Sequence, residues 1–315
     1  KSKKMATTTS ITTTYAGESA SKYVSASLLT ANTIDNGGIT VMPNVKFKQV
    51  VKKLDVDSIL RDGDCDFTAT STITLTEGVI EPLSLMVNLQ LCKDSFRSDW
   101  DAIEMGYSAF DVLPKSFADF LIGHISAKVA LKNEQNIWSG DKAVSGEFDG
   151  LTTLLTVDAS LPSANEVAGT SAISAPATVV AELGKIVDAI PSALYGRDDL
   201  RIYVSQSVHK AYVRALGTLG YVDKFNNQDM GSDLLFDGIK LFVAHGLSAN
   251  VAIATTIDNI YFACGILNDS NIVKLLDMSD VDGSENVRII CRMTGAVQYY
   301  NVEDIVTYGI TNAAN

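Results

Sequence analysis

The segment "DFTATSTITLTEGVIEPLSLMVNLQLC", residues 66–92, alternates apolar and polar residues almost without interruption. Up to Glu77 a ladder of threonines alternates with apolar and small residues, and after Pro82 leucines alternate with polar residues. An alternation with a period of two is typical of half-buried strands, so the sequence predicts a β-hairpin. Each arm of roughly a dozen residues would reach on the order of 40 Å, which is long for one domain of this size.

The length of the turn determines which residues of this hairpin share a face. A two-residue loop at 78–79 would put the leucines on the side opposite to Phe67 and Ile73, whereas an odd loop within 77–81 keeps one face apolar. The sequence therefore predicts an odd loop and an apolar face that is buried against another copy of the chain, with the threonine face exposed. The candidate interface residues on the hairpin are Phe67, Ile73, Leu75, Leu83, Leu85, Val87 and Leu89.

Composition and charge limit the class of protein. The chain has 315 residues, enough for about two structural units or one large domain, and its 46% hydrophobic content is ordinary for a globular core. The net charge of −12 argues against tight binding of phosphate backbones, so nucleic acid is expected only as cargo without specific contacts. No run of ~18 apolar residues predicts a membrane span.

The four cysteines show no metal-ligand spacing, and we expect them to be buried, unpaired thiols in a reducing compartment. In the predicted register Cys65 and Cys92 point to opposite faces of the hairpin, so they form no disulfide. The chain begins at Lys1. Proteolytic maturation, an end set by expression and an internal start at Met5 all remain open.

The remaining segments predict an α+β protein. Residues 1–44 form an extended arm without sustained periodicity, which needs a partner surface to become ordered. The strand that follows has a basic edge, and Lys46 and Lys48 are candidate contacts to an acidic neighbouring subunit; a merely solvated edge is the alternative. Further predicted elements are a helix over 115–137, helices over 176–191 and 205–220 (the second capped by Ser205), several buried strands, and a long final strand kinked at Gly295.

Motifs for catalysis or cofactor binding are missing from the sequence. It contains no nucleophile elbow, phosphate-binding loop or zinc motif, so we expect neither enzymatic activity nor a cofactor. The segment "DMSDVDGSE", residues 277–285, superficially resembles a calcium loop, but Met278 and Ile289 stand at two ligand positions. We expect a solvated acidic turn there.

Two stretches together resemble a known family. The order of "TLTEGVIEPLSLMVNLQLCKDSF" (residues 74–96) and "LKNEQNIWSGDKAVSGEFDGLTTLL" (residues 131–155) is similar to that in major capsid proteins of tailed bacteriophages with the Hong Kong 97-like fold. Glu134, Gly140, Gly150 and Leu151 match the family's layout after its long helix. The resemblance extends over nearly the whole chain and rests mainly on the order of its elements.

The resemblance implies a division of the chain into five parts. These are an N-terminal arm (1–44), an extended loop with its flanking strand (45–99), a peripheral domain with a spine helix (100–150), an axial domain (151–285) and a return strand to the peripheral domain (286–315). It also implies a shell protein that assembles in the host cytoplasm and is found in the virion, around double-stranded DNA.

The partners implied by the resemblance are many copies of the chain in hexamers and pentamers, and packaged DNA; portal, scaffold, protease or decoration proteins are compatible with it, and a membrane is not a partner. An encapsulin-type compartment shell and a soluble hydrolase are the alternatives. Some family members join their subunits through a Lys–Asn bond, but no lysine occurs between Leu54 and Cys92. We therefore expect no such cross-link from this hairpin.

Overall fold

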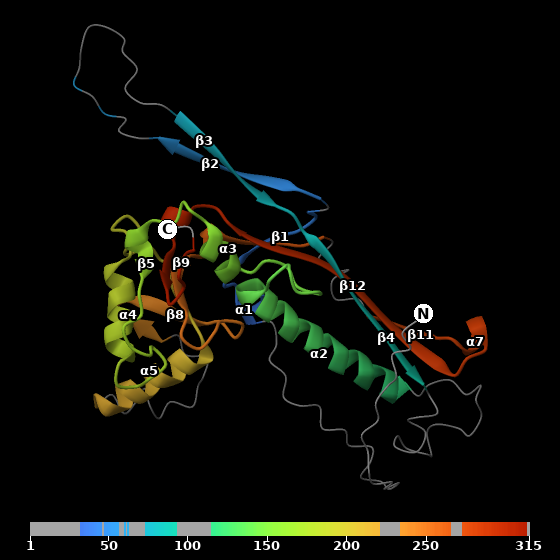
Figure 1. The fold of residues 1–315 in the computed structure, drawn as a ribbon. Helices are drawn as coiled ribbons and strands as arrows, with labels where there is room; N and C mark the ends of the chain where they lie inside the picture. Colours follow the sequence, from blue (N-terminus) through green and yellow to red (C-terminus); the bar gives the residue numbers. More distant parts are fainter. Residues whose placement is uncertain are drawn as a thin grey trace.

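The computed structural model describes residues 32–45, 47–56, 60, 62, 73–92, 115–220, 234–265 and 273–313. These residues form a two-stranded ribbon, a five-stranded sheet with a long helix, and a six-stranded sheet with shorter helices (Figure 1). The short helical turns are α1 (Asn32–Asp35), η2 (Ser163–Asn165), η3 (Ile257–Asn259), α7 (Ser279–Asp282) and η5 (Val302–Asp304). The predicted α+β class is confirmed.

The alternating stretch forms two strands that do not pair with each other. β3 (Ile73–Ile80) pairs antiparallel with β2 (Gln49–Val56), and β4 (Leu83–Cys92) pairs antiparallel with β12 (Asn286–Tyr299). The predicted hairpin between β3 and β4, with an odd loop within 77–81, is therefore wrong. Alternation identifies a strand but does not identify the strand that pairs with it. Pro82, which has no N–H group to donate, lies between the two collinear strands β3 and β4 and does not begin the second arm of a hairpin.

The five-stranded sheet has one covered face and one exposed face. Its strand order is β1 (Thr40–Met42), β10 (Ile260–Ala263), β12 and β11 (Val273–Asp277), with β4 also paired to β12. Helix α2 (Lys115–Ser139), predicted over 115–137, lies beside this sheet, and its Asn133 Nδ2 is 3.3 Å from Met293 Sδ on β12. Alternate β12 residues on the side of Met293 are buried: Val287, Ile289 and Cys291.

Gly295 marks the point where β12 changes neighbours. Residues before Ala296 pair with β4, and residues from Ala296 onward pair with β10. A Cβ at Gly295 would press against the ring of Phe148 at 2.9 Å, so the close packing here requires glycine. The long strand that was predicted to kink at this residue therefore links two parts of the sheet.

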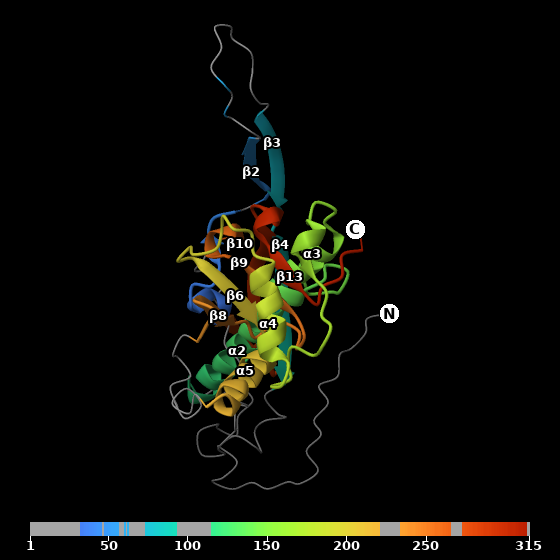
Figure 2. The same ribbon diagram turned by 90° about the vertical axis from the view of Figure 1, so that its left-hand side faces the viewer.

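The six-stranded sheet forms the second unit. Its order is β5 (Glu166–Val167), β13 (Val306–Tyr308), β9 (Ala252–Thr256), β6 (Leu200–Val204), β8 (Ile239–Val243) and β7 (Leu235–Phe236). Helices α4 (Val179–Asp188) and α5 (Gln206–Thr218) lie together on one face (Figure 2), and α3 (Leu151–Val157) follows the long helix. The predicted Ser205 cap is confirmed, since its side chain accepts a hydrogen bond from the Val208 N–H. Because β13 belongs here, segment 286–315 divides between the two sheets.

The C-terminal part of the predicted arm packs on its own chain. Thr33 is fully buried, and its N–H and Oγ1 donate to the Glu134 carboxylate at 3.0 and 2.5 Å. Trp138 Nε1 donates to Thr33 Oγ1 at 2.8 Å, and β1 adds a parallel strand next to β10. The expectation that all of 1–44 needs a partner surface is thus wrong for residues 32–44, while residues 1–31 lie outside the described part.

Candidate functional site

The β2–β3 ribbon projects away from the body of the molecule (Figures 1 and 2). Its base is anchored: Ile80 is buried against the sheet, and Gln298 Nε2 donates to the Val79 carbonyl at 3.4 Å. Lys53 Nζ lies 3.2 Å from Glu303 Oε1, which adds an ion pair between ribbon and body. The ribbon therefore leaves the body in a defined direction.

One face of the ribbon, here called the apolar ribbon face, consists mostly of hydrophobic residues. The register pairs Val50 with Val79, and strand alternation places Ile73 on the same face as this pair, with the Lys52–Glu77 pair between them. Exposed fractions are 41% for Val50, 46% for Val79 and 64% for Ile73. A two-stranded ribbon alone is at best marginally stable in water, so this face requires a partner surface.

The nine residues predicted as candidates for subunit interfaces lie in different environments. Ile73 is exposed on the ribbon, and Lys48 lies at its foot, 3.1 Å from Glu81. The β4 residues belong to the five-stranded sheet instead. There Leu85 is 7% exposed within the subunit's own core, Leu83 and Val87 are half-buried, and Leu89 is 47% exposed. Phe67, Lys46 and the side chain of Leu75 lie outside the described residues.

The expected burial of the leucine face of residues 83–91 between subunits is therefore wrong for Leu85. Leu85 belongs to the same cluster as Trp138, and its pairing partner Met293 contacts Asn133 of α2. The apolar side of β4 is covered in part by this chain's own helix.

Sequence reasoning overlooked Val50 of β2, which contributes to the apolar ribbon face. The run of β-branched residues in "QVV", residues 49–51, was the available signal for this strand. Two further apolar side chains near the ribbon are largely exposed, namely Phe47 at 83% and Leu60 at 95%. The ribbon thus presents more apolar surface than the prediction from residues 66–92 contained.

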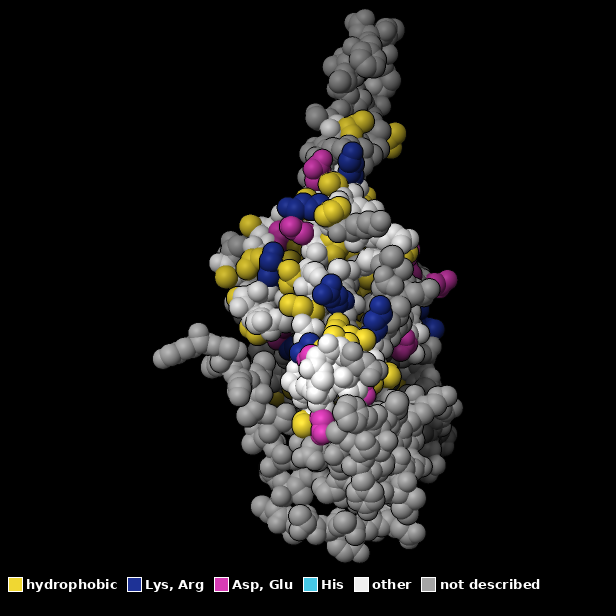
Figure 3. Space-filling model, turned by 90° about the vertical axis from the view of Figure 1, so that its right-hand side faces the viewer, with side chains coloured by type: hydrophobic (Ala, Val, Ile, Leu, Met, Phe, Trp, Pro, Cys, Tyr) yellow, Lys and Arg dark blue, Asp and Glu magenta, His cyan; other side chains and the backbone are white. Residues whose placement is uncertain are grey.

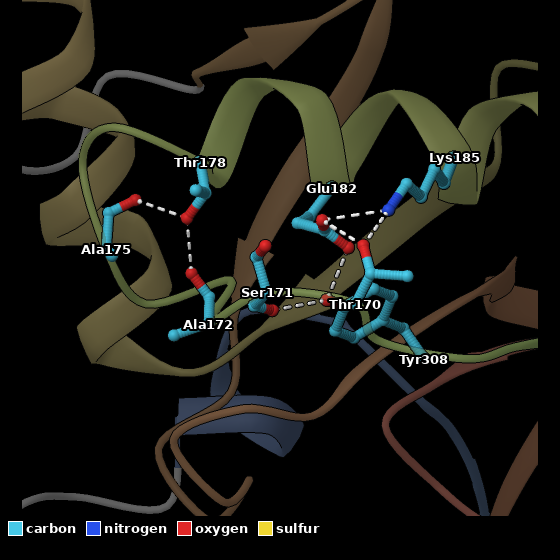
Figure 4. Close-up of polar contacts among 8 residues, drawn as sticks. All are labelled: Thr170, Ser171, Ala172, Ala175, Thr178, Glu182, Lys185 and Tyr308. Carbon is cyan, nitrogen blue, oxygen red and sulfur yellow. Dashed lines mark hydrogen bonds and ion pairs between the residues drawn. The ribbon is translucent and has the colours of Figure 1, made fainter.

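A cluster of polar side chains joins α4 to β13 in the six-stranded unit (Figure 4). Glu182 is 3% exposed, and its carboxylate accepts from Thr170 Oγ1 at 3.0 Å, Lys185 Nζ at 2.9 Å and the Tyr308 hydroxyl at 2.7 Å. Burial raises the pKa of Glu182, but the hydrogen bonds from Lys185, Tyr308 and Thr170 outweigh it and hold that pKa below its usual value.

This cluster has the properties of a structural clip. Burial and the neighbouring Glu182 carboxylate also raise the pKa of Tyr308, which keeps its hydroxyl protonated as a donor to Glu182 and to the Ser171 carbonyl. Because the Glu182 carboxylate is buried and its oxygens already accept three hydrogen bonds, it is poorly placed to exchange protons with a substrate. The cluster instead fixes residues 170–178 against the sheet.

Within the residues that the structure describes, no group of three His, Cys, Asp or Glu side chains is placed to hold a metal ion. No helix among them has both the length and the apolar character that a bilayer span requires. A polar cleft of about 330 Å³ lies between the end of α2 and residues 245–248, and it contains the Lys132–Glu147 ion pair.

Comparison of the whole fold with solved structures gives matches over most of the chain. The capsid of a native GTA particle aligns with a TM-score of 0.56 at 14% identity, covering 90% of this chain and 91% of that chain. The capsid of Myoviridae phage XM1 aligns with a TM-score of 0.56 at 10% identity, covering 91% and 95%. The chain has the fold of tailed-phage capsid proteins.

The predicted Hong Kong 97-like capsid fold is therefore confirmed as a fold. An encapsulin complex from Synechococcus elongatus matches as well, with a TM-score of 0.55 at 8% identity, covering 91% of this chain and 89% of that one. Phage capsids outnumber encapsulins among the similar structures described. No protein-family model and no curated protein sequence matches the chain.

Proposed function

We propose that this chain is a major capsid protein that assembles into the icosahedral head of a tailed bacteriophage around double-stranded DNA. The observation that carries the proposal is the anchored ribbon with its uncovered apolar face. Burial of one ribbon face would remove on the order of 500 Å² of apolar surface, worth ~10 kcal/mol before ordering costs. Repeated over every copy of a closed shell, such a contact is sufficient to drive assembly.

In this proposal the chain has a structural role without enzymatic activity. The five-stranded sheet with α2 serves as the peripheral domain, and the six-stranded unit serves as the axial domain at the centres of hexamers and pentamers. The DNA is enclosed without sequence-specific contacts, which fits the net charge of −12. Assembly takes place in the host cytoplasm and the product is found in the virion.

The experiment is expression of the chain followed by electron microscopy of the purified protein. Wild-type protein should give closed particles, whereas Ile73→Asp combined with Val79→Asp should give folded subunits that remain unassembled. Val79→Thr is the matched control, because it keeps the β-branched shape and should still assemble. Closed particles from the double aspartate variant would show that the apolar ribbon face is not an assembly contact.

The similarity to an encapsulin keeps a compartment shell as the second candidate. Both candidates predict closed particles, and they differ in content. Particles from infected or induced cells that contain genomic DNA support the phage head, whereas particles that contain an enzyme cargo and no genome support the compartment.

A further inference from the structure

A cleft of about 260 Å³ lies at the β7 edge of the six-stranded sheet. It is bounded by the hairpin of β7 and β8 and by the loop that leads from α4 into β6. Three cationic side chains line it, namely Arg197, Arg201 and Lys240, together with the carboxylates of Asp198 and Asp237. The lining thus carries one more positive than negative charge, on a protein whose net charge is −12.

Strand pairing places two of these cations side by side. β6 and β8 are parallel neighbours, and their register pairs Arg201 with Lys240 (Figure 2). Ile202 and Val204 of β6 pack in the core with α4 and α5, so Arg201 and Lys240 project from the opposite face of the sheet. Because adjacent strands are only about 4.8 Å apart, the two positive charges repel each other, and an anion bound between them removes that repulsion.

Arg201 is held in place without a carboxylate. Its Nη1 donates to the backbone carbonyls of Asp198 at 2.6 Å and Leu200 at 2.9 Å. Within the described part of the chain it forms no ion pair, and its Nε and Nη2 donate to no residue. A guanidinium that is already oriented by the backbone and still has donors to offer is suited to an oxyanion.

The other charges of the cleft leave this role to Arg201. Arg197 donates through Nε and Nη2 to both carboxylate oxygens of Asp199, at 2.9 and 2.7 Å. These bonds hold the pKa of Asp199 below its usual value, so Asp199 stays ionised and engaged with Arg197. Asp198 and Asp237 are both exposed, so water and salt screen their negative charges.

The pairing of cations at the cleft differs from the distribution of charge elsewhere on the surface. On the face shown in Figure 3, Lys and Arg side chains lie dispersed among acidic and hydrophobic side chains. At the cleft, the sheet register fixes a guanidinium beside an ammonium group. The fork of an arginine and the point charge of a lysine together match the several oxygens of a phosphate group.

We propose that this cleft binds a phosphate group, with Arg201 and Lys240 as its cationic partners. Inorganic phosphate and the phosphodiesters of DNA share this chemistry. The site does not depend on the capsid function proposed above. Because the whole chain is acidic, we expect weak binding of inorganic phosphate, with a Kd on the order of 1 mM.

Isothermal titration of the purified protein with inorganic phosphate, at constant ionic strength, tests the site. Arg201→Gln combined with Lys240→Gln should lower the affinity on the order of tenfold or more, while circular dichroism shows a folded protein. Lys142→Gln with Lys210→Gln is the charge-matched control, because both lysines are exposed and lie outside the cleft. The control should bind phosphate as the wild type does.

A variant with the opposite effect guards against loss of folding. Asp237 has a positive φ of 49°, a conformation that asparagine also tolerates, so Asp237→Asn removes a negative charge from the cleft without straining the turn. Its affinity for phosphate should rise about threefold. Absence of saturable binding to the wild type, an equal loss in the lysine control, or weaker binding by Asp237→Asn would each overturn the proposal.

Fluorescence anisotropy with a short duplex DNA identifies the source of the phosphate. Duplex binding that the Arg201→Gln and Lys240→Gln variant loses would show that the cleft meets DNA phosphates. Duplex binding that this variant keeps, or no duplex binding, together with its loss of inorganic phosphate, would show that the cleft takes a free anion. A wild-type protein that binds neither probe would contradict the proposed site and leave the capsid function untouched.

Discussion

At the residue scale, several buried polar groups join segments that are distant in the sequence. Glu134 receives two hydrogen bonds from Thr33, a residue 101 positions away, and Glu182 receives one from Tyr308, 126 positions away. Sequence analysis singled out Glu134 only through its place in a family layout and did not single out Glu182. A carboxylate can be buried only where hydrogen-bond donors surround it, and the donors to Glu134 and Glu182 come from distant parts of the sequence that meet only in the folded chain.

Removal of the Glu182 carboxylate should destabilise the subunit. Glu182→Ala leaves Tyr308 and Lys185 without their buried acceptor, at a cost of about 2–4 kcal/mol in the free energy of unfolding. Urea denaturation of unassembled subunits measures this cost. A variant as stable as wild type would show that the cluster is not a structural clip.

The same carboxylate predicts a pH dependence. The folded chain holds the pKa of Glu182 below its usual value. The stabilisation that the ionised Glu182 gives the folded state is therefore complete above the pKa of an unfolded glutamate, about 4.3, and is lost as the pH falls through the pKa of Glu182 in the folded state. The difference in stability between wild type and Glu182→Gln should thus be constant near neutral pH and shrink below about pH 4.5. A difference that grows on acidification would contradict this assignment.

Gly246 closes the junction between α2 and the six-stranded unit. A Cβ at this position would overlap the backbone carbonyl of Glu134, so Gly246→Ala should cost about 3 kcal/mol or more. Gly184 is the matched control: it is helical with open space around it, so Gly184→Ala should stabilise by up to about 1 kcal/mol. Thermal unfolding of both variants tests the contrast, and equal midpoints would refute it.

At the element scale, the sequence predicted most elements and failed on one pairing. Helix α2, the Ser205 cap and the long strand β12 have local signals that were read correctly. The pairing of β4 depends on β12, almost 200 residues further along, and no local pattern encodes that partner. The ribbon was expected from residues 66–92, but half of it comes from residues 49–56.

The corrected pairing reverses an expectation about Leu85. A residue buried only between subunits would affect assembly alone. Leu85 instead lies in the subunit core, so Leu85→Ala should cost about 2–4 kcal/mol in subunit stability. Its neighbour Met86 points to the exposed side, and Met86→Ala should change stability by less than about 0.5 kcal/mol. Chemical denaturation of both variants distinguishes the two environments, and similar losses would contradict the register of β4.

At the scale of the whole molecule, the subunit combines two well-packed units with a ribbon that neither unit covers. Each of the two units has its own buried hydrophobic core. The apolar ribbon face, in contrast, is not covered by any residue in the described part of the same chain. The proposed assembly gives the ribbon its partner, since an adjacent copy would cover the apolar ribbon face.

The most direct test is a cryo-electron microscopy map of the purified wild-type protein at a resolution that traces the backbone. We expect closed particles in which the β2–β3 ribbon of each subunit lies across an adjacent subunit, with its apolar face covered. Protein that stays monomeric under all assembly conditions, or particles in which the ribbon folds back on its own subunit, would contradict the proposed assembly.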